Sequence, residues 1–587
     1  MLTGAEPFVL FDDAATGRAR LYRAPVETIG AATLDEVEPL LERMRGATAR
    51  GLHGAGFLGY EAGHWAEPKL RAVAHPHPGP LAWWGLFESV EHVADAAALL
   101  PPSEAAFAGP PRPLLERAEY LARVEAALEL IRAGEIYQAN LTFPCEVPVS
   151  GDPLALYARL RAGGRGRWEG AIWTGETWLL SASPELFFTL EEGVVTARPM
   201  KGTAPRHRGP REDAREVAAL AADPKQRAEN LMITDLLRND LSRIAEPGSV
   251  AVPRLHEVET YPTVHQMTST VNARLRDGLD AVDVLRAAFP SGSVTGAPKI
   301  RAMQAIAELE NAPRGAYTGS MGWIAPRGDA AFNVLIRTLA WDGAAPQARL
   351  HLGSAVVADS DPAAEWDECL AKGAFVTRGV RAPDLFETMR FEPEAGVVDL
   401  SRHLARMRAS ADALGYVFDR HGARNELQAA TFRLTAPALI RLRLSPGGAL
   451  AIGVSALPPP LPEPVPVAAV PLPTTSDDYR LRHKTADRRP YETALSVAGT
   501  PEAVLVRPDG LITEGTYTSI FVARGERLVT PSLRADLLPG VLRSRLLEEG
   551  RAEEADLTLD DLSEGFLIGN AVRGLLAAVL VATDGGP

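Results

Sequence analysis

Short apolar segments recur through the first part of the chain and are typical of β-strands. Trp178–Leu180, Leu186–Leu190 and Val194–Ala197 follow one another, separated by short stretches that contain polar residues, proline or glycine. Apolar runs of this length, bounded by turn-forming residues, predict strands rather than helices. We therefore expect these segments to be strands of a large sheet.

Two amphipathic stretches predict helices with clear N-terminal signals. The first covers residues 223–244, where Asp223 can cap the helix and Pro224 can take the first helical position. The second covers residues 362–375; three oxygen-bearing residues, 359–361, precede it, and a proline opens it. A capping side chain followed by proline is a strong start signal for a helix.

The second predicted helix carries charged residues on one face. Glu365, Glu368 and Lys372 are spaced i, i+3 and i+7, which places them together. One interpretation is a surface Glu368–Lys372 pair that contributes about 0.2–0.5 kcal/mol. The other is an acidic metal edge beside a cation that holds an anionic substrate. Glu229, on the first helix, is either a solvated glutamate or the second carboxylate of a magnesium site with Glu368.

The pattern breaks near residue 380 and then restarts with a strand at 385–391, a turn at 393–396 and a helix at 401–414. We place the main boundary there. The predicted domains are 1–378, with an N-terminal subregion of residues 1–110, and 379–587. The proline-rich run 457–473 favours an extended linker. It would join two lobes of the second domain, residues 384–456 and 475–587.

Composition restricts the class of protein without naming a reaction. The chain has 587 residues and a formal net charge of −14, so nucleic acid and anionic membranes are not expected partners. Its two cysteines cannot form a disulfide framework or a four-cysteine zinc site. The N-terminus has no secretion signal, and the apolar segment 574–582 is too short to span a membrane. We expect a soluble, cytoplasmic, multidomain protein.

Two ionisable residues lie at the ends of predicted strands in the first domain. Lys201 stands between an apolar strand and a glycine, and Glu185 precedes the apolar segment 186–190. A lysine that is buried or near other positive charge becomes a neutral nucleophile, and a buried glutamate can act as a general acid. The simpler interpretation of Lys201 is a side chain that extends from a strand end into water.

A set of motifs in residues 1–375 resembles the chorismate-utilising enzymes, in the order expected for that family. The resemblance implies a large antiparallel β-sandwich with helices. Lysine at position 201 is typical of component I of aminodeoxychorismate synthases, whereas anthranilate synthases have alanine there. The chain departs from the family in a less glycine-rich turn at 353–355 and in Met200, where isoleucine is common. The motifs are 134–141, 183–185, 199–203, 228–233, 236–241, 289–299 and 359–362.

The resemblance also implies roles for individual residues. Lys201 would attack C2 of chorismate and displace the 4-hydroxyl group, with Glu185 as proton donor; ammonia would then add at C4 and release the lysine. Glu229 and Glu368 would hold Mg²⁺ near the ring carboxylate, and Glu365 would support the metal through water. The positions that would line the substrate are His265, Thr295, Tyr317, Arg337, Gly353, Ser354 and Lys372.

The second domain contains residues suited to pyridoxal phosphate. Lys484 is flanked by His483 and lies near two arginines, a positive setting that lowers a lysine pKa. Glu514 ends a strand-like run and is an acidic partner for the pyridine nitrogen. Arg406 and the backbone amides of Val541 and Leu542, where a Pro-Gly turn opens a helix, would bind the phosphate. Taken alone, Lys484 and Glu514 also fit ordinary surface turns.

Motifs in residues 384–580 resemble the fold-type IV pyridoxal phosphate enzymes. That family includes branched-chain and D-amino-acid aminotransferases and 4-amino-4-deoxychorismate lyase. The resemblance implies a two-lobed domain that builds its cofactor site at a homodimer interface. A departure is Thr518–Ser519, where many members have Ser-Asn. The motifs are 386–390, 402–406, 483–485, 514–516, 538–541 and 570–574.

The combination predicts an α+β and α/β multidomain enzyme that converts chorismate and ammonia into 4-aminobenzoate, a folate precursor, with Mg²⁺ and pyridoxal phosphate. No cysteine lies in a glycine-rich nucleophile turn, so a separate glutamine amidotransferase subunit is the expected ammonia source. Two alternatives fit the same motifs. One is an anthranilate- or salicylate-type synthase fused to a branched-chain or D-amino-acid aminotransferase, and Lys201 argues against its anthranilate form. The other is a degenerate second domain that only scaffolds the amidotransferase.

Overall fold

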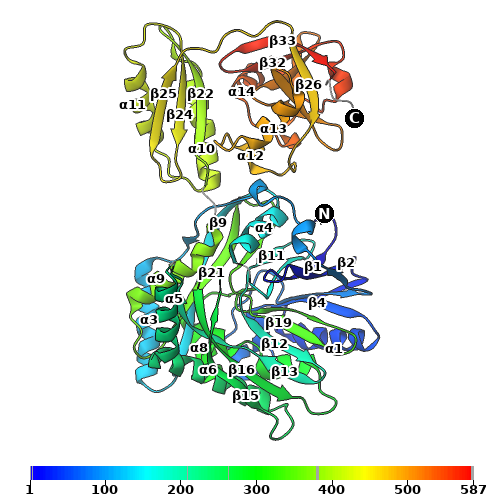
Figure 1. Cartoon of the computed structure of the whole chain (residues 1–587), viewed down its shortest axis with the longest axis vertical. Coiled ribbons are helices and arrows are strands. Elements are labelled where there is room, and N and C mark those ends of the chain that lie inside the picture. Colours follow the sequence, from blue (N-terminus) through cyan, green and yellow to red (C-terminus); the bar gives the residue numbers. More distant parts are fainter. Residues whose placement is uncertain are drawn as a thin grey trace. The chain divides into compact units, whose positions relative to one another are not determined.

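The computed structural model describes residues 2, 4–164, 166–207, 209–261, 264–378 and 382–582. The chain forms two compact units (Figure 1). The first contains residues 1–101, 110–147 and 157–379; the second contains residues 102–109, 148–156 and 380–587. The division near 380 agrees with the predicted boundary, but the two short segments differ from the prediction of a continuous first domain, 1–378.

The short segments join the second unit through an aromatic contact. Phe107 is 1% exposed and belongs to the same apolar cluster as Leu385 and Leu404. Its ring lies 6.1 Å from that of Tyr416 and 5.6 Å from that of Tyr479. Residues 107–108 also pair with Val149–Ser150 at the end of a long strand. Sequence patterning did not reveal this arrangement because it depends on contacts between distant parts of the chain.

The first unit is an antiparallel β-sandwich, as the resemblance implied. The strand order of one sheet is β17 (Gly296–Ala297), β9 (Gln138–Ser150), β21 (Gln347–Val356), β20 (Thr338–Trp341), β11 (Trp178–Ser181), β10 (Glu169–Trp173), β1 (Phe8–Asp13), β2 (Arg18–Arg23) and β6 (Glu91–Val93); β7 (Phe107–Ala108) and β8 (Arg112–Pro113) pair with β9. The other sheet has the order β14 (Met200–Pro205), β16 (Val264–Arg274), β13 (Val194–Ala197), β12 (Leu186–Glu191), β19 (Ala330–Asn333), β18 (Ser320–Ile324), β4 (His53–Leu58), β5 (Ala82–Phe87) and β3 (Glu27–Ala31); β15 (Ala251–Thr260) pairs with β16.

Strand β5 shows why this unit has long apolar runs. All six of its residues are buried. Trp83 and Phe87 face the cluster between the two sheets, whereas Trp84 faces a cluster on the other side of its sheet, where helices α1, α6 and α7 pack. The α-helices in the part of the chain before residue 379 are α1 (Leu34–Ala49), α2 (Pro68–Arg71), α3 (Arg117–Arg132), α4 (Pro153–Gly164), α5 (Pro210–Ala222), α6 (Pro224–Ser242), α7 (Ala281–Ala288), α8 (Lys299–Glu310) and α9 (Pro362–Gly373).

The predicted elements of the first unit are present. The three predicted strands are β11, β12 and β13, but β11 lies in one sheet while β12 and β13 lie in the other. At the start of α6, the Asp223 side chain accepts hydrogen bonds from the backbone N–H groups of residues 225 and 226. At the start of α9, Asp361 accepts one from Ala364. Both helix starts are therefore confirmed.

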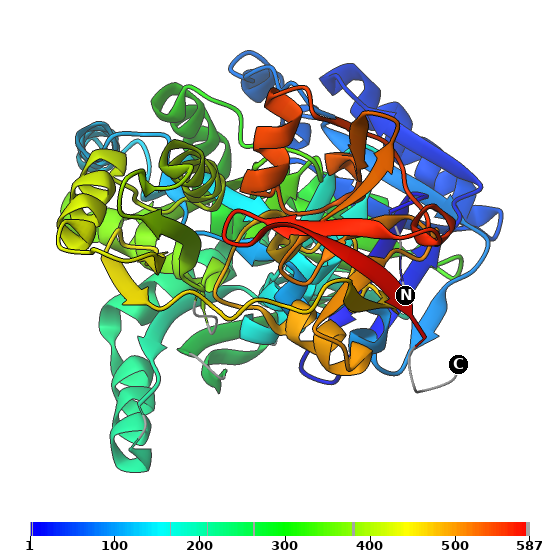
Figure 2. The same cartoon turned by 90° about the horizontal axis from the view of Figure 1, so that it is seen from above.

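The second unit has two lobes (Figure 2, yellow-green to red). The smaller contains a sheet of order β23 (Gly396–Val397), β22 (Leu385–Glu392), β24 (Ala438–Leu444) and β25 (Leu450–Ser455), with helices α10 (Leu400–Leu414) and α11 (Arg420–Thr431). The larger has the order β28 (Ile512–Gly515), β27 (Glu502–Val506), β26 (Val465–Pro471), β33 (Gly574–Val581), β32 (Phe566–Asn570), β29 (Ser519–Arg524), β30 (Arg527–Thr530) and β31 (Ala552–Glu554), with α12 (Tyr479–Arg482), α13 (Arg489–Ala498) and α14 (Val541–Glu548).

The linker prediction for residues 457–473 is wrong in its second part. Residues 465–471 form β26, which pairs in parallel with both β27 and β33. Val467 packs on one face of the sheet and Val470 on the other, so the strand is buried on both sides. The two prolines are tolerated because Pro466 precedes the first residue paired with β27 and Pro471 ends the strand.

We expect Gly56→Ala to destabilise the first unit. A Cβ atom at position 56 would lie 2.1 Å from the Trp83 carbonyl oxygen and 2.7 Å from the Trp84 Cα, in backbone that cannot move aside easily. Overpacking of this kind costs about 1–3 kcal/mol. Thermal unfolding measured by calorimetry would show it. Gly447→Ala is the control, since no atom lies within 4 Å of its added Cβ; equal stability of the two variants would contradict the expectation.

Candidate active sites

The first candidate site brings together the two strand-end residues of the first unit. Lys201 lies in β14 and is half-buried; Glu185 lies just before β12 and is 5% exposed. Burial and then Lys372 lower the pKa of Lys201, while Glu229 and Glu185 oppose that shift. Burial raises the pKa of Glu185 to about 7. Both shifts act against the charged forms, so the Lys201 amine loses its proton and the Glu185 carboxyl group keeps its proton more readily than they would in water.

The position of Glu185 is fixed by its backbone. Its N–H donates to Ser183 Oγ at 3.3 Å, and its carbonyl oxygen accepts from the Val334 N–H at 3.1 Å. Ser183 Oγ in turn donates to the Val334 carbonyl oxygen at 2.6 Å. Glu185 Oε1 is buried without a hydrogen-bond partner among the described residues. Its side chain is thus held at the strand end with an oxygen unoccupied.

Two carboxylates of the predicted metal site, Glu365 and Glu368, raise the pKa of the third, Glu229. Burial raises the pKa of Glu229, and Glu365 and Glu368 add to that rise. An ion pair of 3.2 Å between Lys225 and Asp359 connects the start of α6 with the segment before α9. The structure therefore brings together carboxylates from the two predicted helices. The sequence alone did not show whether these two helices meet.

The donor set fits a divalent cation. Glu365 is 9% exposed; its Oε1 accepts from Ser360 at 2.7 Å, and its Oε2 is buried without a partner in the described part of the chain. Mg²⁺ needs only one or two protein carboxylates and keeps several waters. Within the described residues, no three histidine, cysteine or acidic side chains already form a closed metal-binding group.

Lys372 links the acidic helix to strand β21. Its Nζ lies 2.8 Å from Glu368 Oε1 and donates to the Gly353 carbonyl oxygen at 2.9 Å. Although burial alone would raise it, the pKa of Glu368 is lowered, chiefly by Lys372. Position 353 needs glycine, because a Cβ would lie 2.6 Å from Thr142 Cγ2. Lys372, Glu368 and Gly353 thus form one side of the site.

Arg337 is available for an anion. It has a left-handed backbone, with φ of 51°, and is half-buried. Burial, followed by Arg378, lowers its pKa. No hydrogen bond or ion pair joins its guanidinium group to the residues that the structure describes. An unpaired, half-buried guanidinium suits a carboxylate ligand.

The other predicted substrate positions already have protein partners. His265 is 1% exposed; its Nε2 lies 2.9 Å from Asp213 Oδ1 and its Nδ1 2.9 Å from Thr260 Oγ1. Thr295 Oγ1 donates to the Ser291 carbonyl oxygen at 3.1 Å. Tyr317 stacks on His351, with ring centroids 5.4 Å apart, and Ser354 Oγ bonds Tyr120. Both ring nitrogens of His265 are therefore already paired, whereas the hydroxyl groups of Thr295 and Ser354 keep acceptor lone pairs for a further partner.

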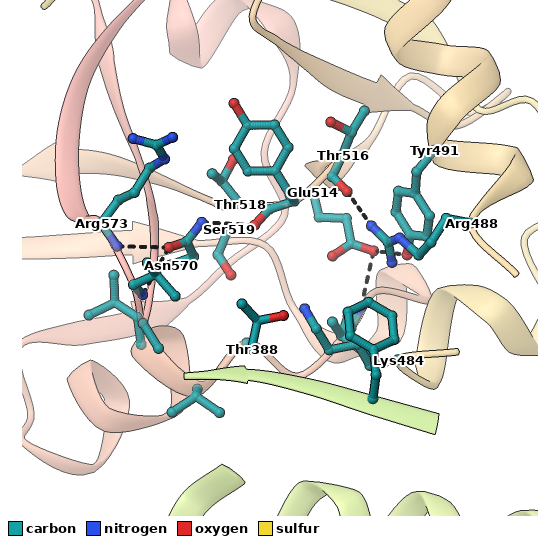
Figure 3. Close-up of a pocket in the computed structure, with 18 of the residues that line it drawn as sticks. Thr388, Lys484, Arg488, Tyr491, Glu514, Thr516, Thr518, Ser519, Asn570 and Arg573 are labelled. Carbon is teal, nitrogen blue, oxygen red and sulfur yellow. Dashed lines mark hydrogen bonds between the residues drawn. The ribbon is translucent and has the colours of Figure 1, made fainter. Parts of the chain in front are cut away.

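The second candidate site is a cavity of about 680 Å³ in the second unit. Lys484 and Glu514 both line it and point into the same space (Figure 3). Burial, followed by Arg406, lowers the pKa of Lys484 to about 7. Its Nζ lies 5.1 Å from the centre of the Phe386 ring. The amine is thus half-buried, in a cavity, and easily deprotonated near neutral pH.

Glu514 is held from two sides. Its Oε1 accepts from the Tyr491 hydroxyl at 2.7 Å and from the Leu538 N–H at 3.3 Å. Burial raises its pKa to about 7. Arg488 lies next to this group, with its guanidinium carbon 3.7 Å from the centre of the Tyr491 ring. The sequence predictions did not include Tyr491 and Arg488, although both follow Lys484 closely: Arg488 is the N-cap residue of α13 and Tyr491 lies in its first turn.

Arg406 and the start of α14 lie together, as predicted for a phosphate group. Arg406 Nη1 donates to the Pro539 carbonyl oxygen at 3.0 Å, directly before the turn that opens α14. The first bond of this helix runs from Ser544 N–H to the Gly540 carbonyl oxygen, so the N–H groups of Val541 and Leu542 precede it. Such free N–H groups at a helix start favour an anion.

Arg406 already forms an ion pair with the buried carboxylate of Glu387. Its Nε and Nη2 donate to the two oxygens of Glu387 at 2.8 and 2.6 Å, and His403 Nδ1 lies 2.7 Å from the same carboxylate. Although burial alone would raise it, the pKa of Glu387 is lowered to about 2, chiefly by Arg406. The sequence predictions gave no role to Glu387, which orients Arg406, the arginine predicted to bind the phosphate group.

These residues fit pyridoxal phosphate. The cavity holds an amine of lowered pKa, a buried carboxyl group across from it, and an arginine beside a helix start. Position 540 requires glycine because a Cβ would lie 2.5 Å from Ser519 Oγ, so the helix start can approach the strand that follows Glu514. Together these are the three features that the cofactor requires: an amine, an acid for the ring nitrogen and a phosphate site.

Comparison with known proteins matches the two units separately. Residues 6–378 match the family model described as chorismate binding enzyme, and residues 384–581 match amino-transferase class IV. The chain is 44% identical over 263 residues to aminodeoxychorismate synthase component 1 of Klebsiella aerogenes; the alignment covers 44% of this chain and 57% of that protein. It is 41% identical over 276 residues to anthranilate synthase component 1 of Methanothermobacter thermautotrophicus, covering 47% and 59%. It thus spans less than two thirds of either relative.

A solved structure agrees with this match. The anthranilate synthase component I of Streptococcus pneumoniae has a TM-score of 0.53 and 26% sequence identity, and the comparison covers 64% of this chain and 94% of that one. The described part of the chain contains no helix that is both long and apolar enough to cross a membrane.

We expect Lys484 to react with acetic anhydride in the cofactor-free protein with a midpoint near pH 7. The amine is protonated and unreactive below its pKa of about 7 and becomes reactive as the pH rises above it. Mass spectrometry of peptides after brief labelling would measure this. Lys225, whose pKa is raised, is the internal control. A midpoint near 10 for Lys484 would contradict the expected burial.

Proposed function

Because the chain belongs to the chorismate binding enzymes and continues into a class IV aminotransferase domain, we propose that it makes 4-aminobenzoate from chorismate in two steps. The first unit would exchange the 4-hydroxyl group of chorismate for an amino group, and the second would remove pyruvate from the product. The observation that carries the proposal is Lys201, a half-buried amine of lowered pKa beside the protonatable Glu185.

In the first step the neutral Lys201 amine forms a bond to C2 of chorismate. The 4-hydroxyl group leaves with a proton from Glu185, so water is the product rather than hydroxide. Ammonia then adds at C4 while the C2–N bond breaks, which returns the amine to Lys201. The sum is chorismate plus ammonia giving 4-amino-4-deoxychorismate and water. The pKa of about 7 for Glu185 suits a group that donates a proton at neutral pH.

We propose that the residues around Lys201 receive a dianionic substrate. Glu229 and Glu368 would hold Mg²⁺, with Glu365 supporting it through water, and the bound metal would supply positive charge for the ring carboxylate. Arg337 and Lys372 would face the other negative charge. His265, Thr295, Tyr317, Gly353 and Ser354 remain proposed substrate positions. Ammonia would come from a separate glutamine amidotransferase.

In the second step Lys484 moves a proton. Pyridoxal phosphate, when bound, supplies an aldehyde for the substrate amine and an electron sink. Lys484 would hold the cofactor and then remove the proton from the amine-bearing carbon, Glu514 would fix the pyridine nitrogen, and Arg406 with the amides of Val541 and Leu542 would hold the phosphate. Loss of pyruvate makes the ring aromatic, which drives the reaction. We propose that this unit acts as a homodimer.

Anthranilate formation is the second candidate for the first unit, because an anthranilate synthase component matches over the same length. The two activities differ in product. The protein should be incubated with chorismate, ammonia, Mg²⁺ and pyridoxal phosphate, and the products identified by mass. 4-Aminobenzoate and pyruvate would support the proposal; fluorescent anthranilate would refute it.

Lys201→Ala is expected to abolish formation of aminodeoxychorismate, because no other amine replaces the nucleophile. Conversion of supplied aminodeoxychorismate into 4-aminobenzoate should continue at the parental rate, which serves as the folding control. The measurement is product formation from each substrate by liquid chromatography. Persistence of the first activity in the variant would show that Lys201 is not the nucleophile.

Glu229→Gln is expected to raise the Mg²⁺ concentration for half-maximal activity by at least ~10-fold, since loss of even an outer-shell partner typically costs that much. Asp235→Asn is the matched control, an exposed carboxylate on the same helix. The readout is a Mg²⁺ titration of the first step. Superimposable titrations for the parent and the Glu229 variant would remove this residue from the proposed metal site.

A further inference from the structure

A buried carboxylate outside the proposed machinery lies under one wall of the second unit's cavity. Glu502 is the first residue of β27 and has no exposed surface. Its two oxygens accept hydrogen bonds from the turn that joins β28 to β29. Thr516 donates to it from its N–H, at 2.7 Å, and from its hydroxyl; Tyr517 N–H donates at 3.2 Å, and Thr518 Oγ1 at 2.8 Å.

These bonds fix the acceptor role of Glu502. Two of the turn's donors are backbone N–H groups, and Ala503 N–H donates a further bond at 2.9 Å. Backbone N–H groups can only donate, so the ionised carboxylate satisfies the whole set. Burial raises the pKa of Glu502, and the bonds from Thr516 and Thr518 oppose that rise. A buried charge with this many donors is costly to remove.

The turn has little freedom. Gly515 N–H donates to the Thr518 carbonyl oxygen at 2.8 Å, and a Cβ at position 515 would lie 2.4 Å from Thr518 Oγ1. The carbonyl oxygens on the turn are also occupied: Arg488 donates to that of Thr516, and Asn570 to that of Tyr517 at 3.2 Å. Tyr517 hydroxyl donates to the Pro501 carbonyl oxygen at 2.7 Å. The turn is therefore held by hydrogen bonds to other protein groups on several sides.

Thr516 and Thr518 also line the cavity; Figure 3 shows Thr518 beside Ser519 and Thr516 beside Arg488. Each hydroxyl group has one hydrogen atom, and Glu502 accepts both of them. With both hydrogens bound, these two hydroxyl oxygens can offer any further partner only lone pairs. This wall can accept hydrogen bonds but cannot donate them from these two groups, so it suits a ligand N–H or ammonium and disfavours a phosphate.

We propose that Glu502 is a positioning residue that shapes and polarises this wall, so that the wall accepts hydrogen bonds from an amine-bearing ligand and leaves the anionic end of the ligand to Arg406 and the start of α14. The inference rests on the proposed function of the second unit. It adds a specificity determinant that touches neither cofactor nor substrate and that acts only through the turn 515–518.

The test uses pyridoxamine 5′-phosphate, which carries an amine and cannot form an imine with Lys484. Glu502→Gln should weaken its binding at least ~10-fold, because the amide leaves turn donors unsatisfied and releases the threonine hydroxyl groups. Glu502→Asp, which keeps the charge, should recover part of the loss. Asp561→Asn is the matched control: Asp561 also accepts bonds from a threonine N–H and hydroxyl, of Thr558, at 2.8 and 3.2 Å, but Thr558 does not line the cavity. Affinity equal to that of the parent protein in a folded Glu502→Gln variant would overturn the proposal.

A second measurement needs no variant. In the cofactor-free full-length protein, the amide hydrogens of residues 516 and 517 should exchange slowly with solvent, because Glu502 already binds them. Protection that arises only after the cofactor is added would overturn the proposal. If the parent protein did not bind pyridoxamine 5′-phosphate, the proposed function of the second unit would fail, while the exchange measurement would still decide whether Glu502 builds the turn.

Discussion

The removal of water from an amine is the physical constraint on which both sites depend. An ammonium group loses most of its hydration when it is buried, so burial favours the neutral form that can make a bond. Lys201 and Lys484 share this environment, and in each case a neighbouring cation, Lys372 or Arg406, strengthens the effect. Carboxyl groups near each amine are shifted in the opposite direction, and Glu185 and Glu514 both have a pKa of about 7. In both units, burial thus lowers the pKa of the amine and raises the pKa of the nearby carboxyl group.

The architecture provides this environment at the ends of strands. In the first unit, Glu185 lies just before β12 and Lys201 lies in β14, and α6 and α9 add acidic residues from outside the sheets. In the second unit, the cavity lies where the turn before α14 meets the ends of β28 and β29. The rigid sheets fix the backbone, and hydrogen bonds to side chains such as Glu387 and Glu502 fix the groups that would contact ligands. In the second unit, the groups that would contact ligands are therefore held by buried acids outside the proposed chemistry.

Local signals in the sequence predicted local structure well. The caps Asp223 and Asp361 and the spacing of Glu365, Glu368 and Lys372 depend only on neighbours within a turn, and the structure confirms the helices that they predict. The motifs likewise identified Lys201 and Lys484. The prolines in residues 465–471 led to the wrong prediction of a linker, because a proline at the edge of a pairing segment does not prevent a central strand. The partners of His265, the Arg406–Glu387 pair and the contacts of Glu502 join residues 5 to 52 positions apart, and no pattern of hydrophobicity or spacing encodes such pairings.

Phe107 has a consequence for how this chain can be divided. Its ring fills part of the core formed by residues that follow position 380, although it precedes them by more than 270 positions. A fragment that starts at the apparent boundary would contain every proposed pyridoxal phosphate ligand and still have an unfilled space among Tyr416, Tyr479 and Leu385. The second unit is therefore discontinuous in sequence, and a single cut near residue 380 would separate it from part of its own apolar core.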